Sequence, residues 1–240
     1  MKDRITSKNN PTVKALCKLK DEPSPERFLI EGKHLVDMAF EAHCLLEVYS
    51  VEEVDYPDVE ITLVSEDVLR KIAVSPSPSG IIGVAKRPQN EAASGPSLLL
   101  DRVQDPGNVG TILRSALAFG YANVFLTEGC ASPYSSKAIA SSQGAIFGLH
   151  IEEIEGENAA ESLQKRGYFI LSSALRNAIP LKEFTLPKKP LCLALGNEGR
   201  GIRESILASS DKVVRIEMEG IESLNVGVAA GILMYTLNRL

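Results

Sequence analysis

Short apolar runs alternate with amphipathic stretches through most of the chain. After residue 97, the runs LLLD, NVFLT, YFILSSA, LCLALG and KVVRI are separated by segments whose apolar residues recur at helical spacing, such as VGTILRSALAFG. Strands that alternate with helices predict a mostly parallel sheet with helices on both faces. The pattern therefore predicts an α/β fold for this part of the chain.

The first ninety residues show a smaller α/β pattern. Apolar spacing predicts helices over PTVKALCKLK, KHLVDMAFEA and SEDVLRKIA, and strands over RFLIEG, CLLEVYSV, EITLV and SGIIGVAKR. Ser65 is the expected N-cap of the third helix. The following stretch RPQNEAASGPS is polar, contains two prolines and has no hydrophobic period, which is typical of a linker. We therefore expect two domains, over residues 1–90 and 97–240.

The net charge of the chain limits how it could contact RNA. The chain has 240 residues and a formal net charge of −5. A general nucleic-acid coat protein would be basic, so any RNA contact must come from a local patch. One basic cluster lies near the N-terminus, and it is either a solvated face or such a patch; its members are Lys2, Arg4, Lys8, Lys14, Lys18 and Lys20.

The cysteine spacing and the length of the apolar runs argue against zinc-binding, disulfide-rich, secreted and membrane-spanning proteins. The four cysteines are widely spaced, with no CxxC pair and no histidine cluster beside them, so neither a zinc site nor a disulfide framework is expected. The polar N-terminus lacks the apolar core of a signal peptide, and no run reaches the roughly 18 apolar residues of a membrane helix. We expect a cytoplasmic protein without a metal or a membrane partner.

Three loops in the second half follow expected strands, where ligands bind in open parallel sheets. They are DRVQDPGNVG, GNEGRG and EMEGIESLN. The three glycines of GNEGRG allow close approach to a nucleotide-like ligand, although a tight turn has the same composition. The loop matches neither the Rossmann fingerprint nor a P-loop, which disfavours a nucleotide-dependent oxidoreductase.

Several polar residues accompany these loops. Arg114 interrupts an apolar helix, so it either reaches solvent or faces a pocket that holds negative charge. Glu198 is either a solvated loop carboxylate or the partner of Arg114. Ser223 and Asn225 precede the last helix, and either could be its N-cap. That helix carries small residues from Gly227 to Gly231, which suit close packing on the sheet or against a second subunit.

The segments GNVGTILRSALAFG, LALGNEGRG and IEMEGIESLNVGVAAG occur in this order. Together they resemble the three signature motifs of the SpoU (TrmH) family of RNA ribose 2′-O-methyltransferases, in the SPOUT superfamily. ITSKNNPTVKALCKL and FLIEGKHLVDMA resemble the RNA substrate-binding domain that precedes the catalytic domain in one branch of the family. The resemblance implies an α/β sheet with a deep trefoil knot, S-adenosylmethionine as cofactor, and a homodimer with the active site near the subunit interface.

The resemblance also implies residue roles. The expected catalytic residues are Asn108, Arg114, Glu198, Ser223 and Asn225. The expected cofactor-binding residues are Gly196, Asn197, Gly199, Ile216, Met218 and Leu224. For RNA binding, the N-terminal domain supplies Arg4, Lys8, Lys14 and Lys18.

Two positions depart from the family pattern. Glu217 stands where the family often has proline, and Gly227 stands where it often has a second serine. The first change affects loop stiffness, and the second removes a hydroxyl group.

The expected activity is methyl transfer from S-adenosylmethionine to a ribose 2′-OH of RNA, with 23S-type ribosomal RNA as the favoured substrate. In such an in-line displacement the protein mainly positions the reactants. Two alternatives stay open, a transfer-RNA 2′-O-methyltransferase and a non-catalytic RNA-binding or ribosome-assembly factor with the same fold.

Overall fold

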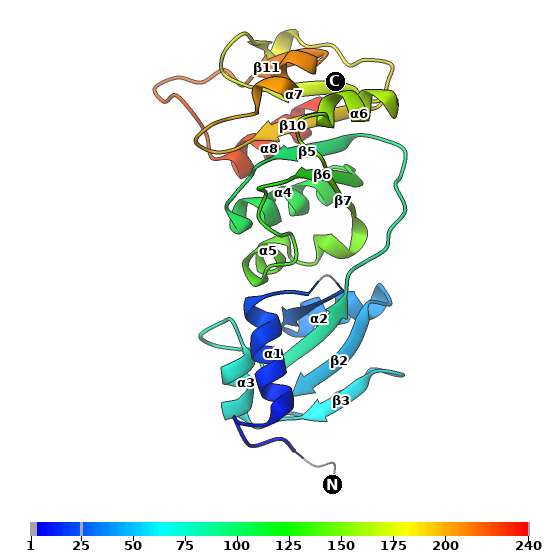
Figure 1. Ribbon diagram of the computed structural model, residues 1–240, viewed down its shortest axis with the longest axis vertical. Helices are drawn as coiled ribbons and strands as arrows, with labels where there is room; N and C mark the ends of the chain where they lie inside the picture. Colours follow the sequence, from blue (N-terminus) through cyan, green and yellow to red (C-terminus); the bar gives the residue numbers. More distant parts are fainter. Residues whose placement is uncertain (1–3, 25, 240) are drawn as a thin grey trace. The chain divides into compact units, whose positions relative to one another are not determined.

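The computed structural model describes residues 4–24 and 26–239, and Lys2 of the basic cluster lies outside them. The chain folds into two compact units, coloured along the sequence in Figure 1. Unit 1 contains the residues up to Gln89 together with 133–147, and unit 2 contains 90–132 and 148–240. The stretch 133–147 lies within the second domain expected from the sequence, but it groups with unit 1.

Unit 1 is built on a four-stranded sheet in the order β1-β4-β2-β3. The strand β4 pairs antiparallel with β1 and β2, and β3 pairs parallel with β2. Helices α1 and α3 pack together and share one apolar cluster with the sheet, while α2 contacts β1 and β4, and α5 contacts the edge strand β1. The bounds are α1 Pro11–Asp21, β1 Arg27–Glu31, α2 Lys33–Glu41, β2 Leu45–Ser50, β3 Glu60–Leu63, α3 Glu66–Ile72, β4 Ile81–Lys86 and α5 Ser136–Ser142.

Unit 2 is built on a seven-stranded sheet in the order β7-β6-β5-β10-β8-β11-β9. Every neighbouring pair in this sheet is parallel, so the carboxyl ends of all seven strands lie at one edge. The strand bounds are β5 Ser97–Asp101, β6 Asn123–Thr127, β7 His150–Ile154, β8 Phe169–Ser173, β9 Ile179–Pro180, β10 Leu191–Gly196 and β11 Lys212–Arg215.

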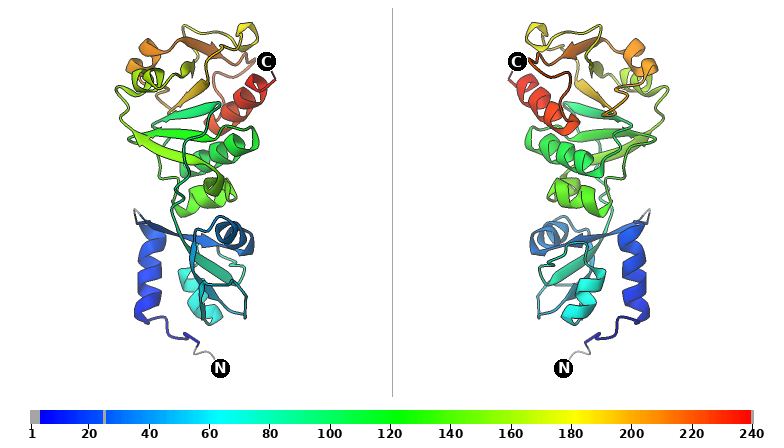
Figure 2. Two further views of the ribbon diagram at one scale, coloured as in Figure 1. Left: turned by 90° about the vertical axis from the view of Figure 1, so that its right-hand side faces the viewer. Right: turned by 90° about the vertical axis from the view of Figure 1, so that its left-hand side faces the viewer.

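Helices cover both faces of this sheet (Figure 2). Helices α4 and α8 pack against each other on one face, and α6 and α7 pack together on the other. Leu99, Phe125 and Ile170 of the central strands share a buried cluster with Leu163 of α6 and Ile206 of α7. The bounds are α4 Pro106–Ala118, α6 Ala159–Lys165, α7 Glu204–Ser209 and α8 Val226–Leu237, with 3-10 turns η1 at Ala145–Gly148 and η2 at Leu181–Glu183. The predicted α/β class with a mostly parallel sheet is confirmed.

The sequence pattern missed two strands and overextended one helix. The edge strand β7 has the sequence HIEEI, whose charged residues conceal it, and β9 has only two residues. The small and apolar residues of SSKAIASSQGAIF predict a helix over 135–147, but α5 ends at Ser142, because Gln143 has a φ of 49° in the left-handed region. The last helix begins at Val226 because Asn225 is its N-cap.

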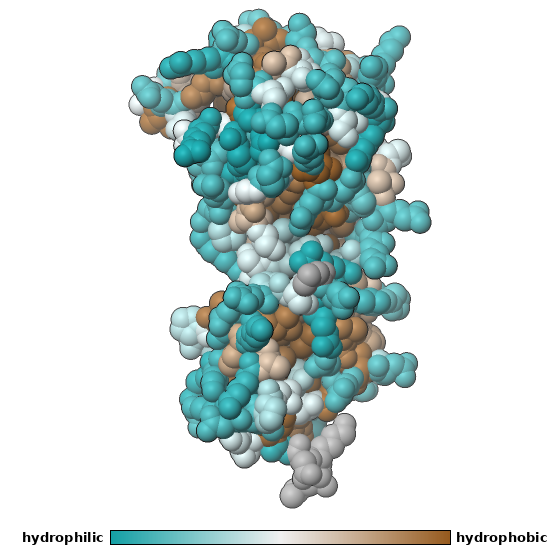
Figure 3. Space-filling view, in the orientation of Figure 1, coloured by the Kyte–Doolittle hydropathy of each residue, from teal (hydrophilic) through white to brown (hydrophobic). Residues whose placement is uncertain are grey.

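Hydrophobic side chains reach the surface only in patches between hydrophilic ones on the face shown in Figure 3. Among the described residues, no helix is long and apolar enough to cross a membrane. The same residues contain no group of three histidine, cysteine or acidic side chains arranged for a metal ion.

A buried carboxylate at the end of β5 connects three loops of unit 2. Asp101 is fully buried, and its Oδ1 accepts hydrogen bonds from Arg203 Nε at 2.9 Å and from Thr127 Oγ1 at 2.9 Å. Its Oδ2 accepts from the backbone N–H of Arg203 at 2.7 Å and from Arg102 Nη2 at 3.2 Å. A carboxylate that is buried must be paired and hydrogen-bonded in this way. Asp101 therefore fixes the segment before α7 to the carboxyl ends of β5 and β6.

We predict that Asp101→Ala lowers the free energy of unfolding by about 3–5 kcal/mol, because it leaves a nearly buried Arg203 guanidinium without its main partner. The measurement is urea unfolding followed by circular dichroism. Glu66→Ala, which breaks the exposed ion pair with Arg70 on α3, is the control and should cost less than about 1 kcal/mol. Equal losses in the two variants would contradict the structural role of Asp101.

Candidate active site

A pocket of about 550 Å³ opens beyond the carboxyl ends of β8, β10 and β11 in unit 2. Its size lies in the range of small-molecule and cofactor sites. All six residues that the sequence nominates for cofactor binding line it, namely Gly196, Asn197, Gly199, Ile216, Met218 and Leu224. Two of the nominated catalytic residues, Glu198 and Ser223, also line it. The pocket therefore gathers residues from two of the three motif loops.

The second motif loop closes on itself at the end of β10. The backbones of Asn197 and Gly201 exchange hydrogen bonds of 3.1 and 2.9 Å. A Cβ atom at Gly196 would lie 2.3 Å from the backbone of Gly201 and Ile202, so a side chain there would open the loop. Asn197 fixes the turn further, because its Nδ2 donates to the carbonyl of Arg102 at 2.9 Å. The glycine at 196 is thus required by close backbone approach.

The third motif loop contributes Met218, Glu222, Ser223 and Leu224 to the lining of the pocket. Within the described part of the chain, no hydrogen bond joins the backbone of residues 217–224 to another segment. The side chain of Glu217 accepts a hydrogen bond from Lys182 Nζ at 2.8 Å, and both side chains are exposed. Backbone groups that lack partners cost free energy when a ligand or neighbour excludes water from them, unless that ligand pairs with them.

This pocket fits S-adenosylmethionine. The backbone groups of Met218, Glu222, Ser223 and Leu224 have no partner in another segment of the described chain and are available to a ligand, and the side chains of Leu195, Ile216 and Leu224 provide apolar walls. The carboxylates of Glu198 and Glu222 line the same space and can balance the charge of a sulfonium and an ammonium group.

A chain of side-chain amides connects the three motif loops. Asn108 Nδ2 donates to Glu198 Oε1 at 2.7 Å, and Asn225 Nδ2 donates to Asn108 Oδ1 at 2.9 Å. Asn225 Oδ1 in turn accepts the N–H groups of Gly227 and Val228, at 2.9 and 3.2 Å. An ionised carboxylate only accepts, so Glu198 fixes the orientation of each amide along this chain. One directional chain therefore runs from the carboxylate to the first turn of α8.

The structure decides two of the alternatives that the sequence left open. Glu198 accepts from Asn108, and no hydrogen bond or ion pair joins it to Arg114 among the described residues, so the alternative of an Arg114–Glu198 pair is not found. Asn225 is the N-cap of α8, whereas Ser223 is exposed at the pocket.

Arg114 lies on the exposed side of α4. Ile112, Leu113 and Ala116 of the same helix are buried, which leaves Arg114 on the outer face with Leu117. Arg114 has no hydrogen bond or ion pair with a described residue, and it does not line the 550 Å³ pocket. Its guanidinium is therefore available to a group from outside this chain.

The small residues of α8 face α4. A Cβ at Gly227 would lie 3.2 Å from Thr111 Cγ2 and 3.1 Å from Asn225 Oδ1, so a serine there would press on both the neighbouring helix and the cap. A Cβ at Gly231 would lie 3.9 Å from Ser115 Oγ. The departure from the family pattern at 227 is thus explained by close packing of the two helices.

The expected RNA-binding side chains lie in unit 1. Lys14 and Lys18 are exposed one turn apart on α1, and neither ammonium group has a hydrogen bond or ion pair with a described residue. Arg4 Nη2 donates to the carbonyl of Val51 at 2.9 Å, and Lys8 lies 3.6 Å from Asp67. The helix therefore offers two free ammonium groups, while Arg4 and Lys8 also have structural partners.

The sequence analysis missed the ionic cluster that supports the second motif loop. Arg203 Nη1 donates to Glu128 Oε1 at 2.6 Å, and Glu128 Oε2 accepts from the N–H of Gly156 at 2.9 Å. The hydrogen bond from Arg203 lowers the pKa of the Glu128 carboxyl below its usual value. The one signal in the sequence was Asp101, an acidic residue directly after an apolar strand.

Comparisons with known proteins agree with this geometry. Residues 96–235 match the family model of the SpoU rRNA methylase family. The chain is 33% identical to the 23S rRNA (guanosine(2553)-2′-O)-methyltransferase RlmP of Bacillus subtilis, over 98% of both chains. It resembles the crystal structure of an RNA 2′-O ribose methyltransferase with a TM-score of 0.83 and 31% identity, over 99% of this chain and 98% of the other.

A further solved structure shows the same fold at lower identity. The AdoMet-bound rRNA methyltransferase of Sinorhizobium meliloti has a TM-score of 0.88 and 24% identity, over 99% of this chain and 97% of that one. The match to the family model and the similarity to a relative along nearly the whole chain together show the family. The chain belongs to the SpoU rRNA methylase family.

Proposed function

We propose that the protein methylates a ribose 2′-OH of 23S-type ribosomal RNA. The observation that carries this proposal is the amide chain from Glu198 through Asn108 to Asn225, which connects the three motif loops beside a pocket of cofactor size. The 33% identity with a 23S rRNA 2′-O-methyltransferase along nearly the whole chain supports ribosomal over transfer RNA.

S-adenosylmethionine, held by the residues that line the pocket, would supply a methyl group already activated by a sulfonium. For the ribose oxygen to accept this methyl group, the 2′-OH must lose its proton. A guanidinium group keeps its proton in proteins, so Arg114 is a poor general base. We assign Arg114 to donate hydrogen bonds to the developing ribose oxygen or to the neighbouring phosphate, and a phosphate oxygen or water accepts the proton.

In this proposal Asn108 positions the Glu198 carboxylate relative to the guanidinium of Arg114. The hydrogen bond from Asn108 Nδ2 holds the Glu198 carboxylate at the pocket wall and keeps it away from Arg114. The guanidinium is then not neutralised within its own chain before the substrate binds. Ser223 places a hydroxyl group at the other side of the pocket, where it can bind the cofactor or the ribose.

A homodimer completes the site in this proposal. Helices α4 and α8 leave apolar side chains exposed beside Arg114, with Leu117 41%, Ile232 38% and Tyr235 46% accessible. A second copy that packs on this face would bury them and bring its own surface next to the free guanidinium.

Two further properties belong to the same proposal. We propose that the segment after β11 passes through the loops around β10 as a trefoil knot, which is consistent with the position of β10 between β5 and β8. We also propose that the protein works in the cytoplasm, where ribosomal RNA is its substrate.

We predict that Arg114→Ala abolishes methyl transfer to unmodified ribosomal RNA while leaving S-adenosylmethionine affinity within about twofold, because Arg114 does not line the cofactor pocket. Arg114→Lys should lose about 100-fold in kcat, since an ammonium group cannot reproduce the planar fork. The measurement is incorporation of label from S-adenosylmethionine, with transfer RNA assayed in parallel. Near-normal methyl transfer by Arg114→Lys would refute the role of the planar guanidinium group.

We predict that Ile232→Asp converts the dimer to a monomer and stops methyl transfer, because the proposed interface would have to bury an unpaired carboxylate. Sedimentation velocity reports the oligomeric state. Leu186→Asp is a matched control, since Leu186 is a 40% exposed apolar side chain elsewhere in unit 2. If the Ile232 variant stays dimeric, the proposed interface is wrong.

A further inference from the structure

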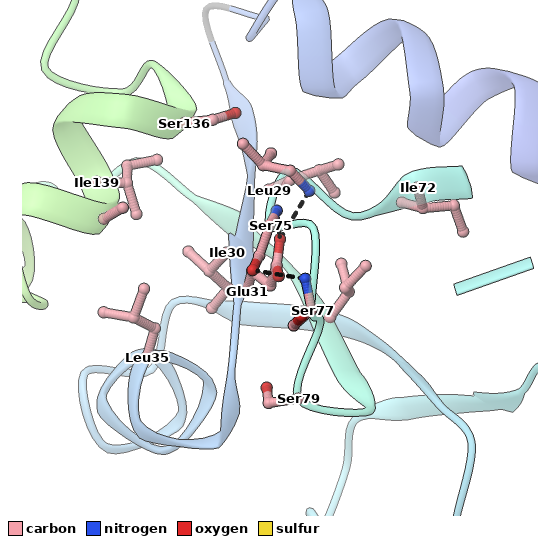
Figure 4. A pocket seen from close by; sticks show the side chains of 13 residues that line it. Leu29, Ile30, Glu31, Leu35, Ile72, Ser75, Ser77, Ser79, Ser136 and Ile139 are labelled. Carbon is pink, nitrogen blue, oxygen red and sulfur yellow. Dashed lines mark hydrogen bonds between the residues drawn. The ribbon is translucent and has the colours of Figure 1, made fainter. Parts of the chain in front are cut away.

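Unit 1 contains a second pocket, of about 360 Å³ (Figure 4). It lies at the end of the edge strand β1, between the loop 74–80 and the helix α5. Most of its wall is apolar and comes from β1, β4 and three helices, with Leu29, Ile30, Leu35, Ile72, Val74, Ile82, Ile139 and Ala140.

The polar groups of this pocket are few and specific. Glu31 is its only charged lining residue, and the hydroxyl groups of Ser75, Ser77 and Ser79 follow one another along the loop. Glu31 Oε2 accepts the backbone N–H groups of Val74 and Ser75, at 2.7 and 3.1 Å (Figure 4). Glu31 Oε1 has no hydrogen bond with a described residue. The pocket therefore offers one fixed carboxylate oxygen as an acceptor.

This chemistry selects a class of ligand. A lone carboxylate between apolar walls repels a phosphate or another anion, and it provides too few oxygen atoms for a calcium or magnesium ion. A flat, uncharged heterocycle with an N–H donor on its edge fits both the apolar walls and the free oxygen. Unpaired RNA bases are recognised in this way, through apolar contacts with their faces and hydrogen bonds to their edges.

Basic groups continue from the pocket to α1. Ser136, at the pocket wall, donates through Oγ to the carbonyl of Lys20 at 3.2 Å, and Lys20 Nζ donates to the carbonyl of Lys71 at 3.2 Å. Lys71 precedes the lining residue Ile72 and donates through Nζ to the carbonyl of Lys8 at 2.8 Å. Lys20 is thus in contact with the lining residue Ser136 through its backbone, and Lys71 adjoins the lining residue Ile72, so both lysines add positive charge to segments beside the pocket that can attract RNA phosphates.

We propose that this pocket holds one unpaired RNA base that bears an exocyclic amino group. The amino group donates to Glu31 Oε1, the apolar walls cover the ring, and the lysines bind the flanking phosphates. The inference rests on RNA being the substrate, and it gives unit 1 a base-reading role in addition to electrostatic attraction. Uracil is the disfavoured base, because it has no exocyclic amine and its single N3–H donor lies between two carbonyl oxygens, which a carboxylate repels.

The test is fluorescence anisotropy of the full-length protein with fluorescein-labelled ten-nucleotide oligo(A), oligo(C) and oligo(U). We expect oligo(A) and oligo(C) to bind at least tenfold more tightly than oligo(U). Ala140→Trp fills the pocket from an exposed position and should remove this difference. His34→Trp is the matched control, because His34 is exposed on α2 and does not line the pocket.

Glu31→Gln replaces the free acceptor atom Oε1 with a hydrogen-bond donor. The amide oxygen can still accept from the loop N–H groups, whereas an NH₂ group replaces the free acceptor. We expect this variant to lose the preference for oligo(A) and oligo(C) and to gain affinity for oligo(U). Equal binding of the three RNAs by the unmodified protein, or an unchanged preference in Ala140→Trp, overturns the proposal.

Methyl transfer to ribosomal RNA, measured on the same proteins, separates this inference from the proposed function. Active Ala140→Trp with an unchanged KM for RNA overturns the base pocket and leaves the methyltransferase assignment intact. A raised KM at constant kcat and constant S-adenosylmethionine affinity supports the pocket. A base preference that depends on the pocket, in a protein that methylates no RNA, supports the pocket and refutes the proposed function.

Discussion

The position of β10 between β5 and β8 is the constraint on which the active site depends. Parallel pairing with both neighbours places the end of β10 level with the ends of the strands beside it. The loop after Gly196 then meets the loop after Asp101 on one side and the segment after β11 near the other. Three segments that are distant in the sequence thereby share one edge of the sheet, which is where ligands bind in folds of this class.

Two polar clusters hold that edge by different means. Asp101 and Arg203 form a buried ion pair with additional hydrogen bonds, which secures the segment after the second loop at a site with little water. Glu198, Asn108 and Asn225 form a more exposed chain of hydrogen bonds, which orders the loop side chains relative to α8. The first cluster supports the loops, and the second leaves Arg114 without an internal partner. In the proposed function, Asp101 and Arg203 therefore support the loops, whereas Arg114 acts on the substrate.

In the proposed function, unit 1 divides RNA recognition between two features. The lysines of α1 and their neighbours would attract any RNA through its phosphates, and such contacts carry no sequence information. The pocket beside Glu31 combines apolar walls with a single acceptor, which is the chemistry needed to distinguish bases. A net acidic protein can thus approach RNA through a local basic face and still select among RNA segments.

The sequence by itself determined the α/β class and most helices and strands, because periodic apolar spacing is a local property. The residues around the pocket were identified through the resemblance of three motifs to a known family. The sequence could not reveal β7 or β9, since one is charged and the other has two residues. The structure decided that Asn225 rather than Ser223 caps α8, a local choice for which both residue types are suitable. Only the tertiary structure decided that Glu198 binds Asn108 rather than Arg114 and that Asp101 meets Arg203. These two pairs depend on strand order, because hydrogen bonds require distances of about 3 Å that residues 90 or more positions apart acquire only when the sheet is assembled.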